Sequence, residues 1–64
     1  MKYYAVIEKK DFGAVFFRVE FASRNLEEAM ERKTDRHNVV TCGFPVKAGH
    51  EIAMRRQGWV GVVE

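Results

Sequence analysis

Alternating apolar and polar positions near the N-terminus predict two antiparallel strands. Residues 3–8 form an apolar stretch, and a second run covers residues 14–21. The second run repeats with a period of two, which is the pattern of a strand with one buried face. Residues 9–13 have the composition of the hairpin loop between the two strands. The predicted odd face of the second strand consists of Val15, Phe17, Val19 and Phe21, and its even face of Phe16, Arg18 and Glu20.

The period changes after Phe21 and predicts a single helix. Asn25 is followed three positions later by Glu28, a spacing at which the acid can reach back to the amide of the capping residue. Acids come early in this segment and bases late, as the helix dipole favours. We expect a helix of about three turns that packs on the odd face of the second strand, since so short a helix needs tertiary contacts. Its narrow apolar stripe consists of Leu26, Ala29 and Met30, followed by Lys33.

The second half of the chain predicts further strands and no second helix. Residues 39–42 have strand composition, and residues 51–56 and 59–63 are typical of two more strands around a turn. The apolar residues include nine valines and five phenylalanines but a single leucine, a balance that favours sheet over helix. The predicted fold class is α+β, with the order β-β-α-β-β. One helix packs on a three- or four-stranded, mainly antiparallel sheet in a single domain of residues 1–64.

Length and charge then narrow the function. Eleven Lys and Arg against nine Asp and Glu give 64 residues a net charge of +2. A chain of this length has a thin core and no room for separate cofactor and substrate lobes. A single cysteine excludes an internal disulfide and, with two histidines far apart, a zinc site, so we expect no metal and no cofactor. Neither a signal peptide nor a membrane helix is evident, so we expect a cytoplasmic protein without a membrane partner.

The residues that could carry out catalysis have simpler explanations. Cys42 lies in an apolar sequence typical of a packed thiol. His50 falls in a predicted turn beside Glu51, and His37 at the end of the predicted helix, where the helix dipole favours a cation. We therefore predict that the protein is not an enzyme.

Residues 10–17 partly match the basic and aromatic run of RNA-binding sheets. Asp11 stands where that run has glycine, and Ala14 where it has a stacking aromatic residue. A charge of +2 is also weak for recruiting a polyanion. A nucleic-acid-binding module is therefore an alternative, and its candidate residues are Tyr4, Phe16 and Arg18.

A second candidate surface lies near the C-terminus. Arg55 and Arg56 end a predicted strand and are followed by Trp59. Arginine offers a rigid fork for carboxylates and tryptophan a large apolar face, and both residue types dominate protein interfaces. With Arg18 they form the predicted partner-binding patch, although a solvated Arg55 and a core Trp59 remain the alternative.

Two segments, residues 22–30 and 48–56, resemble the small coliphage early protein that inhibits bacterial RNA polymerase. The helix start Leu26-Glu27-Glu28-Ala29 and the strand start Ala48-Gly49-x-Glu51-Ile52 carry the resemblance. It implies a β-β-α-β core and last-strand arginines that contact the acidic jaw region of the polymerase β′ subunit and block open-complex formation. Arg56 falls on the second of these arginines, whereas Arg55 is one position late, so the two should point to opposite faces. Residues 39–46 resemble an insertion, and residues 59–64 are strand-like where that family has a loose tail.

Residues 1–9 and 26–30 have a weaker resemblance to the HicB antitoxin fold, and anti-CRISPR proteins use similar small scaffolds. The expected function is a non-enzymatic phage-type inhibitor that blocks a large host protein complex with an acidic surface, with RNA polymerase favoured. It would act in the host cytoplasm. The alternatives are the nucleic-acid-binding module and an anti-CRISPR or antitoxin-like protein-binding domain. The chain could be a monomer or a dimer formed through edge strands.

Overall fold

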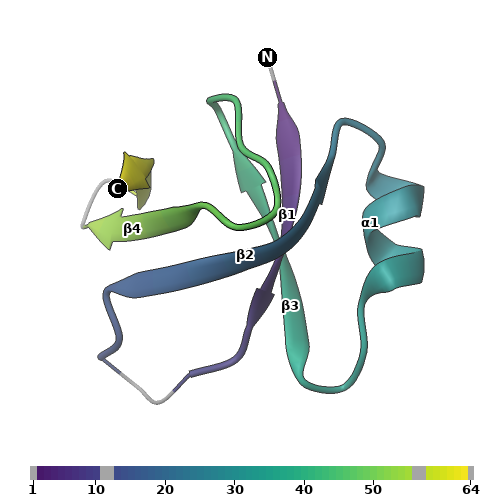
Figure 1. The fold of residues 1–64 in the computed structure, drawn as a ribbon, viewed down its shortest axis with the longest axis horizontal. Helices are drawn as coiled ribbons and strands as arrows, with labels where there is room; N and C mark the ends of the chain where they lie inside the picture. The colour runs from purple at the N-terminus through teal and green to yellow at the C-terminus, as the bar shows by residue number, and fades with distance from the viewer. Residues whose placement is uncertain (1, 11–12, 56–57, 64) are drawn as a thin grey trace.

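The computed structural model describes residues 2–10, 13–55 and 58–63, in which five strands and one helix are formed (Figure 1). The strands make one curled sheet in which every pairing is antiparallel, in the order β3-β1-β2-β4-β5. No helix within these residues is long and apolar enough to cross a membrane. The bounds are β1 Tyr3–Glu8, β2 Phe16–Ser23, α1 Leu26–Arg32, β3 His37–Cys42, β4 Glu51–Arg55 and β5 Gly58–Val63.

The α+β class is confirmed, but the predicted order and sheet size are not. The described order is β-β-α-β-β-β, with five strands instead of three or four. The segment that resembled an insertion, residues 39–46, supplies most of β3 and the start of the loop to β4. That loop carries the chain across the sheet, because β3 pairs with β1 while β4 pairs with β2. β3 and β4 are therefore strands of the same sheet, although they do not pair with one another.

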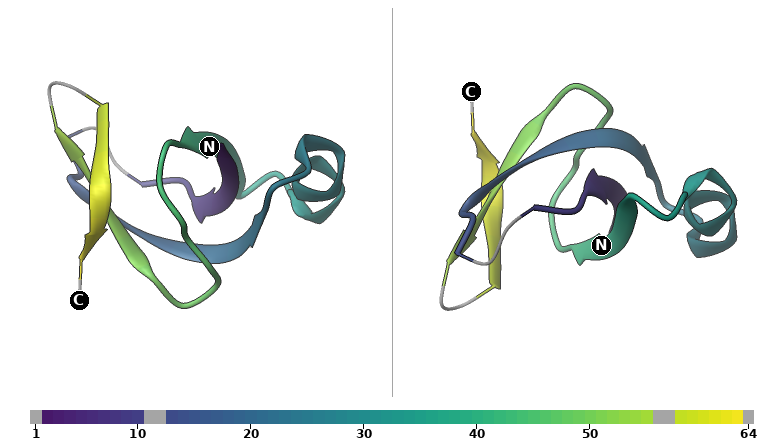
Figure 2. Two further views of the ribbon diagram at one scale, coloured as in Figure 1. Left: turned by 90° about the horizontal axis from the view of Figure 1, so that it is seen from above. Right: turned by 90° about the horizontal axis from the view of Figure 1, so that it is seen from below.

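β2 connects two layers of the fold. Its first half, from Phe16 to Arg18, pairs with β4, and its second half, from Val19 to Ser23, pairs with β1. Figure 2 shows β2 running from the β1–β3 side to the β4–β5 side of the curled sheet. The core lies between these two parts and consists of Ala5, Ile7, Val19, Cys42, Val46 and Ile52.

A β-bulge changes which side of β2 faces this core. Ile7 lies opposite Val19, whereas Val6 lies opposite Phe21, so Glu20 is an extra residue on β2. Before the bulge the odd positions of β2, Phe17 and Val19, face the core. After the bulge the even position Ala22 faces it.

Phe21 therefore departs from the predicted odd face. It shares with Val6 the face opposite the core, and the guanidinium carbon of Arg32 on α1 lies 4.5 Å from the centroid of its ring. The prediction that Val15, Phe17, Val19 and Phe21 form a single face is wrong at Phe21, because the extra residue inverts the alternation.

The helix begins where the sequence predicts. The Asn25 side chain accepts hydrogen bonds from the backbone N–H groups of Glu27 at 2.9 Å and Glu28 at 3.3 Å, which is N-terminal capping. The helix has 7 residues, shorter than the expected three turns, and lies against β1 and β2. Of the predicted apolar stripe only Ala29 is buried, while Leu26 is 47 % and Met30 52 % exposed. The expectation that this stripe covers the odd face of β2 is therefore wrong.

Candidate functional site

Cys42 ends β3 inside the core. Its side chain is fully buried and packs in the same cluster as Val19 and Ile52. Burial raises the pKa of the Cys42 thiol above its ordinary value of 9.0, because the charged thiolate loses its solvation. A thiol held in its neutral form is a poor nucleophile, so the position of Cys42 agrees with the predicted packed thiol.

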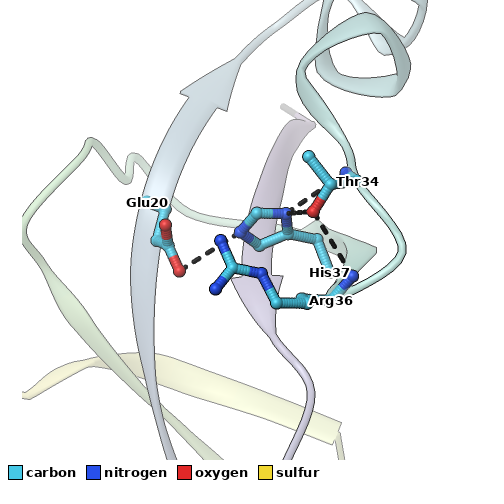
Figure 3. Close-up of polar contacts among 4 residues, drawn as sticks. All are labelled: Glu20, Thr34, Arg36 and His37. Carbon is cyan, nitrogen blue, oxygen red and sulfur yellow. Dashed lines mark hydrogen bonds and ion pairs between the residues drawn. The ribbon is translucent and has the colours of Figure 1, made fainter.

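His37 is the first residue of β3 and lies at the centre of a small polar network (Figure 3). The Nδ1 atom of His37 is 3.2 Å from the backbone nitrogen of Thr34 and 2.8 Å from the Oγ1 of the same residue. The Nε2 atom of His37 is 3.2 Å from the Oε2 of Glu20. Because Nδ1 accepts the Thr34 N–H, the neutral ring carries its proton on Nε2 and donates it to the Glu20 carboxylate. Both ring nitrogens are thus engaged, and the residue is 7 % exposed.

This position corrects the sequence interpretation of His37. The helix ends at Arg32, so His37 belongs to a strand and not to the helix terminus, and the helix dipole does not account for it. Its partner Glu20 is the extra residue of the bulge. No pattern in the sequence indicates this pair, because the bulge that turns the Glu20 side chain toward His37 depends on the pairing of β1 with β2.

His50 lies in the turn before β4, as predicted. It is half-buried, and its Nδ1 accepts the backbone N–H of Lys47 at 3.4 Å. The backbone N–H of His50 donates to the Lys47 carbonyl at 3.1 Å. The ring borders an open pocket of about 370 Å³ that is also lined by Tyr3, Pro45 and Val46. Among residues 2–10, 13–55 and 58–63, no cluster of three or more His, Cys, Asp or Glu side chains is arranged to hold a metal ion.

The residues of the nucleic-acid interpretation do not form one surface. Phe16 and Arg18 lie in the first half of β2, on the face away from the core, and Phe16 is 44 % exposed. Tyr4 lies on β1 opposite Ser23, at the other end of β2. At about 3.3 Å per residue the two ends of this strand are roughly 20 Å apart. Tyr4 therefore cannot stack on the same nucleotide as Phe16.

The structure also divides the predicted partner-binding patch. The rings of Trp59 and Phe17 meet edge to face, with centroids 5.4 Å apart and planes at 78°, and both pack against the core. Arg18 lies on the opposite side of the sheet, across from Glu51 on β4. Arg55 is the last residue of β4 and pairs with Gly58, and Arg56 lies outside the described residues.

An exposed row of apolar side chains crosses the far end of the sheet. Val15 and Met54 are opposite one another, since the Met54 N–H donates to the Val15 carbonyl at 2.8 Å, and Met54 pairs in turn with Trp59 on β5. Val15 is 36 % and Met54 37 % exposed. We call Val15, Met54 and Trp59 the apolar row. The sequence alone does not predict this row, because nothing in the pattern of β4 distinguishes the exposed Met54 from the buried Ala53 beside it.

Lys10 covers one side of this end of the sheet. Its Nζ donates to the carbonyl of Phe16 at 2.7 Å and lies 5.7 Å from the centroid of the Phe17 ring. A cation over an aromatic face is favourable and holds the lysine in place. Lys10 is thereby held against the first half of β2.

No protein-family model, curated protein or solved structure matches this chain.

Proposed function

We propose that this chain is a non-enzymatic protein-binding domain that blocks a large host protein complex with an acidic surface. The observation that supports this proposal best is the exposure of large apolar side chains on both sides of the β2–β4 pair. Val15 and Met54 are exposed on one side and Phe16 on the other. Exposed apolar side chains that gather in one region of a small protein are typical of protein-binding surfaces.

The positions of the candidate catalytic residues favour a binding function over an enzymatic one. Cys42 is buried as a neutral thiol, and both ring nitrogens of His37 are engaged in holding the loop after α1 to β2. Each side chain has a structural role that its use as a nucleophile or base would disrupt. The protein would therefore act by occupying a surface.

The favoured target is RNA polymerase, which rests on the sequence resemblance alone. Arg56 is the residue that carries over from that family, and Arg55 would add charge at the same end of the sheet. Arg18 lies on the opposite side of the sheet from Trp59, so it would not share a contact made through Trp59. Arginine binds carboxylates through two parallel hydrogen bonds, so an acidic patch on the target would supply the complementary charge. If the chain is encoded by a phage, this contact would form in the host cytoplasm.

Affinity capture from nuclease-treated bacterial lysate tests the proposal. The tagged chain is compared with the Arg55→Glu/Arg56→Glu variant and with Lys33→Glu/Arg36→Glu, a control that changes the same charge in the exposed α1–β3 loop. We expect the unaltered chain and the control to retain RNA polymerase and the Arg55/Arg56 variant to lose it. Equal retention by all three chains would remove these arginines from the mechanism.

Two other outcomes would overturn the proposal. If nuclease releases everything that the chain retains, the nucleic-acid-binding module becomes the better explanation, and Phe16→Ala should then weaken binding to single-stranded RNA or DNA. If the chain retains no large complex, the inhibitor function is wrong.

A single substitution gives a sharper measurement. We expect Arg56→Glu to abolish inhibition of promoter-dependent transcription by purified RNA polymerase. The free energy of unfolding should change by less than about 0.5 kcal/mol, as is usual for a surface substitution. Unchanged inhibition by this variant would contradict the assignment of Arg56.

A further inference from the structure

We propose that the open pocket beside His50 binds a small aromatic carboxylate. This proposal goes beyond binding to a host protein and does not depend on it. The pocket lies between the start of β1 and the loop from β3 to β4, which pass beside one another in Figure 1. Its volume of about 370 Å³ is in the range of pockets that hold small organic ligands. We call it the loop pocket, and its lining residues are Tyr3, Pro45, Val46, Lys47 and His50.

The apolar part of the lining is held in place by the fold. Val46 is 5 % exposed and belongs to the hydrophobic core, and Tyr3 packs against the same core from β1. The guanidinium carbon of Arg24 lies 5.7 Å from the centroid of the Tyr3 ring, a contact that favours one position of the ring. Pro45 adds a second rigid ring. A flat apolar group can therefore pack here without much ordering of the protein.

Backbone hydrogen bonds fix the turn that carries the polar part of the lining. The Lys47 N–H donates to Nδ1 of His50, and the His50 N–H donates to the Lys47 carbonyl. The Gly49 N–H donates to the Val19 carbonyl at 2.9 Å. Three backbone N–H groups of the turn are thus used within the protein. Phosphate sites are commonly built from such N–H groups, so the loop pocket is better suited to an anion held by side chains.

The polar side chains of the loop pocket can all donate a hydrogen bond. Because Nδ1 of His50 accepts the Lys47 N–H, the neutral ring carries its proton on Nε2. This Nε2 has no hydrogen-bond partner among the described residues and is not buried, so its N–H is available to a ligand. The Lys47 ammonium and the Tyr3 hydroxyl are the other donors.

Charge distinguishes the loop pocket from the other open pocket of the described residues. That pocket has a volume of about 470 Å³ and is lined by side chains of both signs, Glu8, Glu20 and Arg18. In the loop pocket the charged lining residue is Lys47, and no described residue of the lining is acidic. Glu51 follows the turn in sequence but lies on the other side of the sheet, across from Arg18. The loop pocket is therefore complementary to an anion.

An aromatic carboxylate matches both parts of this lining. Its ring would lie against Tyr3 and Pro45, and its carboxylate would accept hydrogen bonds from Nε2 of His50 and the Lys47 ammonium. A hydrogen bond to a charged group is stronger than one between neutral groups, so the carboxylate should contribute more than a neutral amide of the same shape.

NMR titration of the isotope-labelled chain with phenylacetate tests the proposal. We expect saturable shifts of the amide signals of Tyr3, Lys47 and His50. Phenylacetamide has the same ring and no charge, and it should bind about tenfold more weakly. Equal affinity for the two compounds, or shifts confined to other parts of the chain, would overturn the proposal. Tighter binding of phenyl phosphate than of phenylacetate would overturn the preference for a carboxylate.

Substitutions assign the contacts. Lys47→Gln removes the ammonium and His50→Phe removes the Nε2 donor while keeping a ring, and each should weaken phenylacetate binding about tenfold. Lys33→Gln makes the same change at an exposed position after α1 and should leave the affinity unchanged. If His50→Phe disturbs the turn, the comparison of Lys47→Gln with Lys33→Gln decides. Equal affinity of these two variants would refute the proposal.

Discussion

His37 connects three parts of the chain through one ring. It holds Thr34 in the loop after α1 and Glu20 on β2, and it is itself the first residue of β3. In a chain this small, a buried polar group that is fully hydrogen-bonded helps to define one arrangement of loop and strands. The ring therefore has a structural role that depends on both of its nitrogens.

Removal of this ring should be costly. His37→Leu leaves the Thr34 N–H and the Glu20 carboxylate without their partner, and we expect a loss of about 1–3 kcal/mol in the free energy of unfolding. His50→Leu, at a half-buried turn position, should lose less. Urea denaturation of both variants measures the difference, and equal losses would show that the network contributes little.

Cys42 makes a pH-dependent contribution. Because burial raises the pKa of its thiol above 9.0, the native state holds this proton more tightly than the unfolded chain does. The contribution of Cys42 to the free energy of unfolding should therefore be constant well below that pH and fall as pH rises through and above it. Cys42→Ala lacks this term, so the stability advantage of the unaltered chain over the variant should shrink between about pH 8 and pH 10. Denaturation curves across this range measure the difference, and a constant advantage would contradict the expectation.

At the scale of elements, the helix depends on one small side chain. Ala29 is fully buried against the sheet, whereas Leu26 is close to half exposed. We expect Ala29→Leu to overpack this contact and to lower the free energy of unfolding by about 1–3 kcal/mol. Leu26→Ala should change it by less than about 0.5 kcal/mol. Thermal unfolding of both variants provides the measurement, and a larger loss for Leu26→Ala would mean that the predicted stripe, and not Ala29, holds the helix.

The sequence predicts local structure better than it predicts pairing. The alternation around Phe17 and Val19 and the cap at Asn25 are confirmed, because each depends on neighbouring residues. The bulge at Glu20 is not predictable in this way, since an extra residue becomes visible only when β1 lies beside β2. The size of the sheet is not predictable for a similar reason. All five segments have strand composition, but the number of strands that join one sheet depends on long-range contacts.

The same limit applies to the candidate site. The exposure of Phe16 and Arg18 follows from their even positions on β2. The distance of Tyr4 from Phe16 follows from the register between β1 and β2, which the sequence of neither strand determines alone. The core position of Trp59 likewise depends on its contact with Phe17 from a strand far away in the sequence.

At the scale of the whole molecule, a thin core makes stability sensitive to association. A domain of about 60 residues buries a smaller share of its surface than a larger domain does, so an interface that covers the apolar row would add substantially to its stability. If two chains associate through edge strands, the melting temperature should rise with protein concentration, because a dimer that dissociates on unfolding is stabilised by mass action. Calorimetry at several concentrations tests this, and a constant melting temperature would contradict a dimer.

The bulge on β2 has a consequence for chain length. Val19 faces the core and Phe21 faces α1, so a chain that lacked Glu20 would have these two residues adjacent and on opposite faces, as regular alternation requires. Such a chain would keep every apolar contact of β2 and lose only the carboxylate partner of His37. Homologous proteins could thus differ by one residue in the middle of this strand, and an alignment that forbids gaps inside strands would misplace half of it.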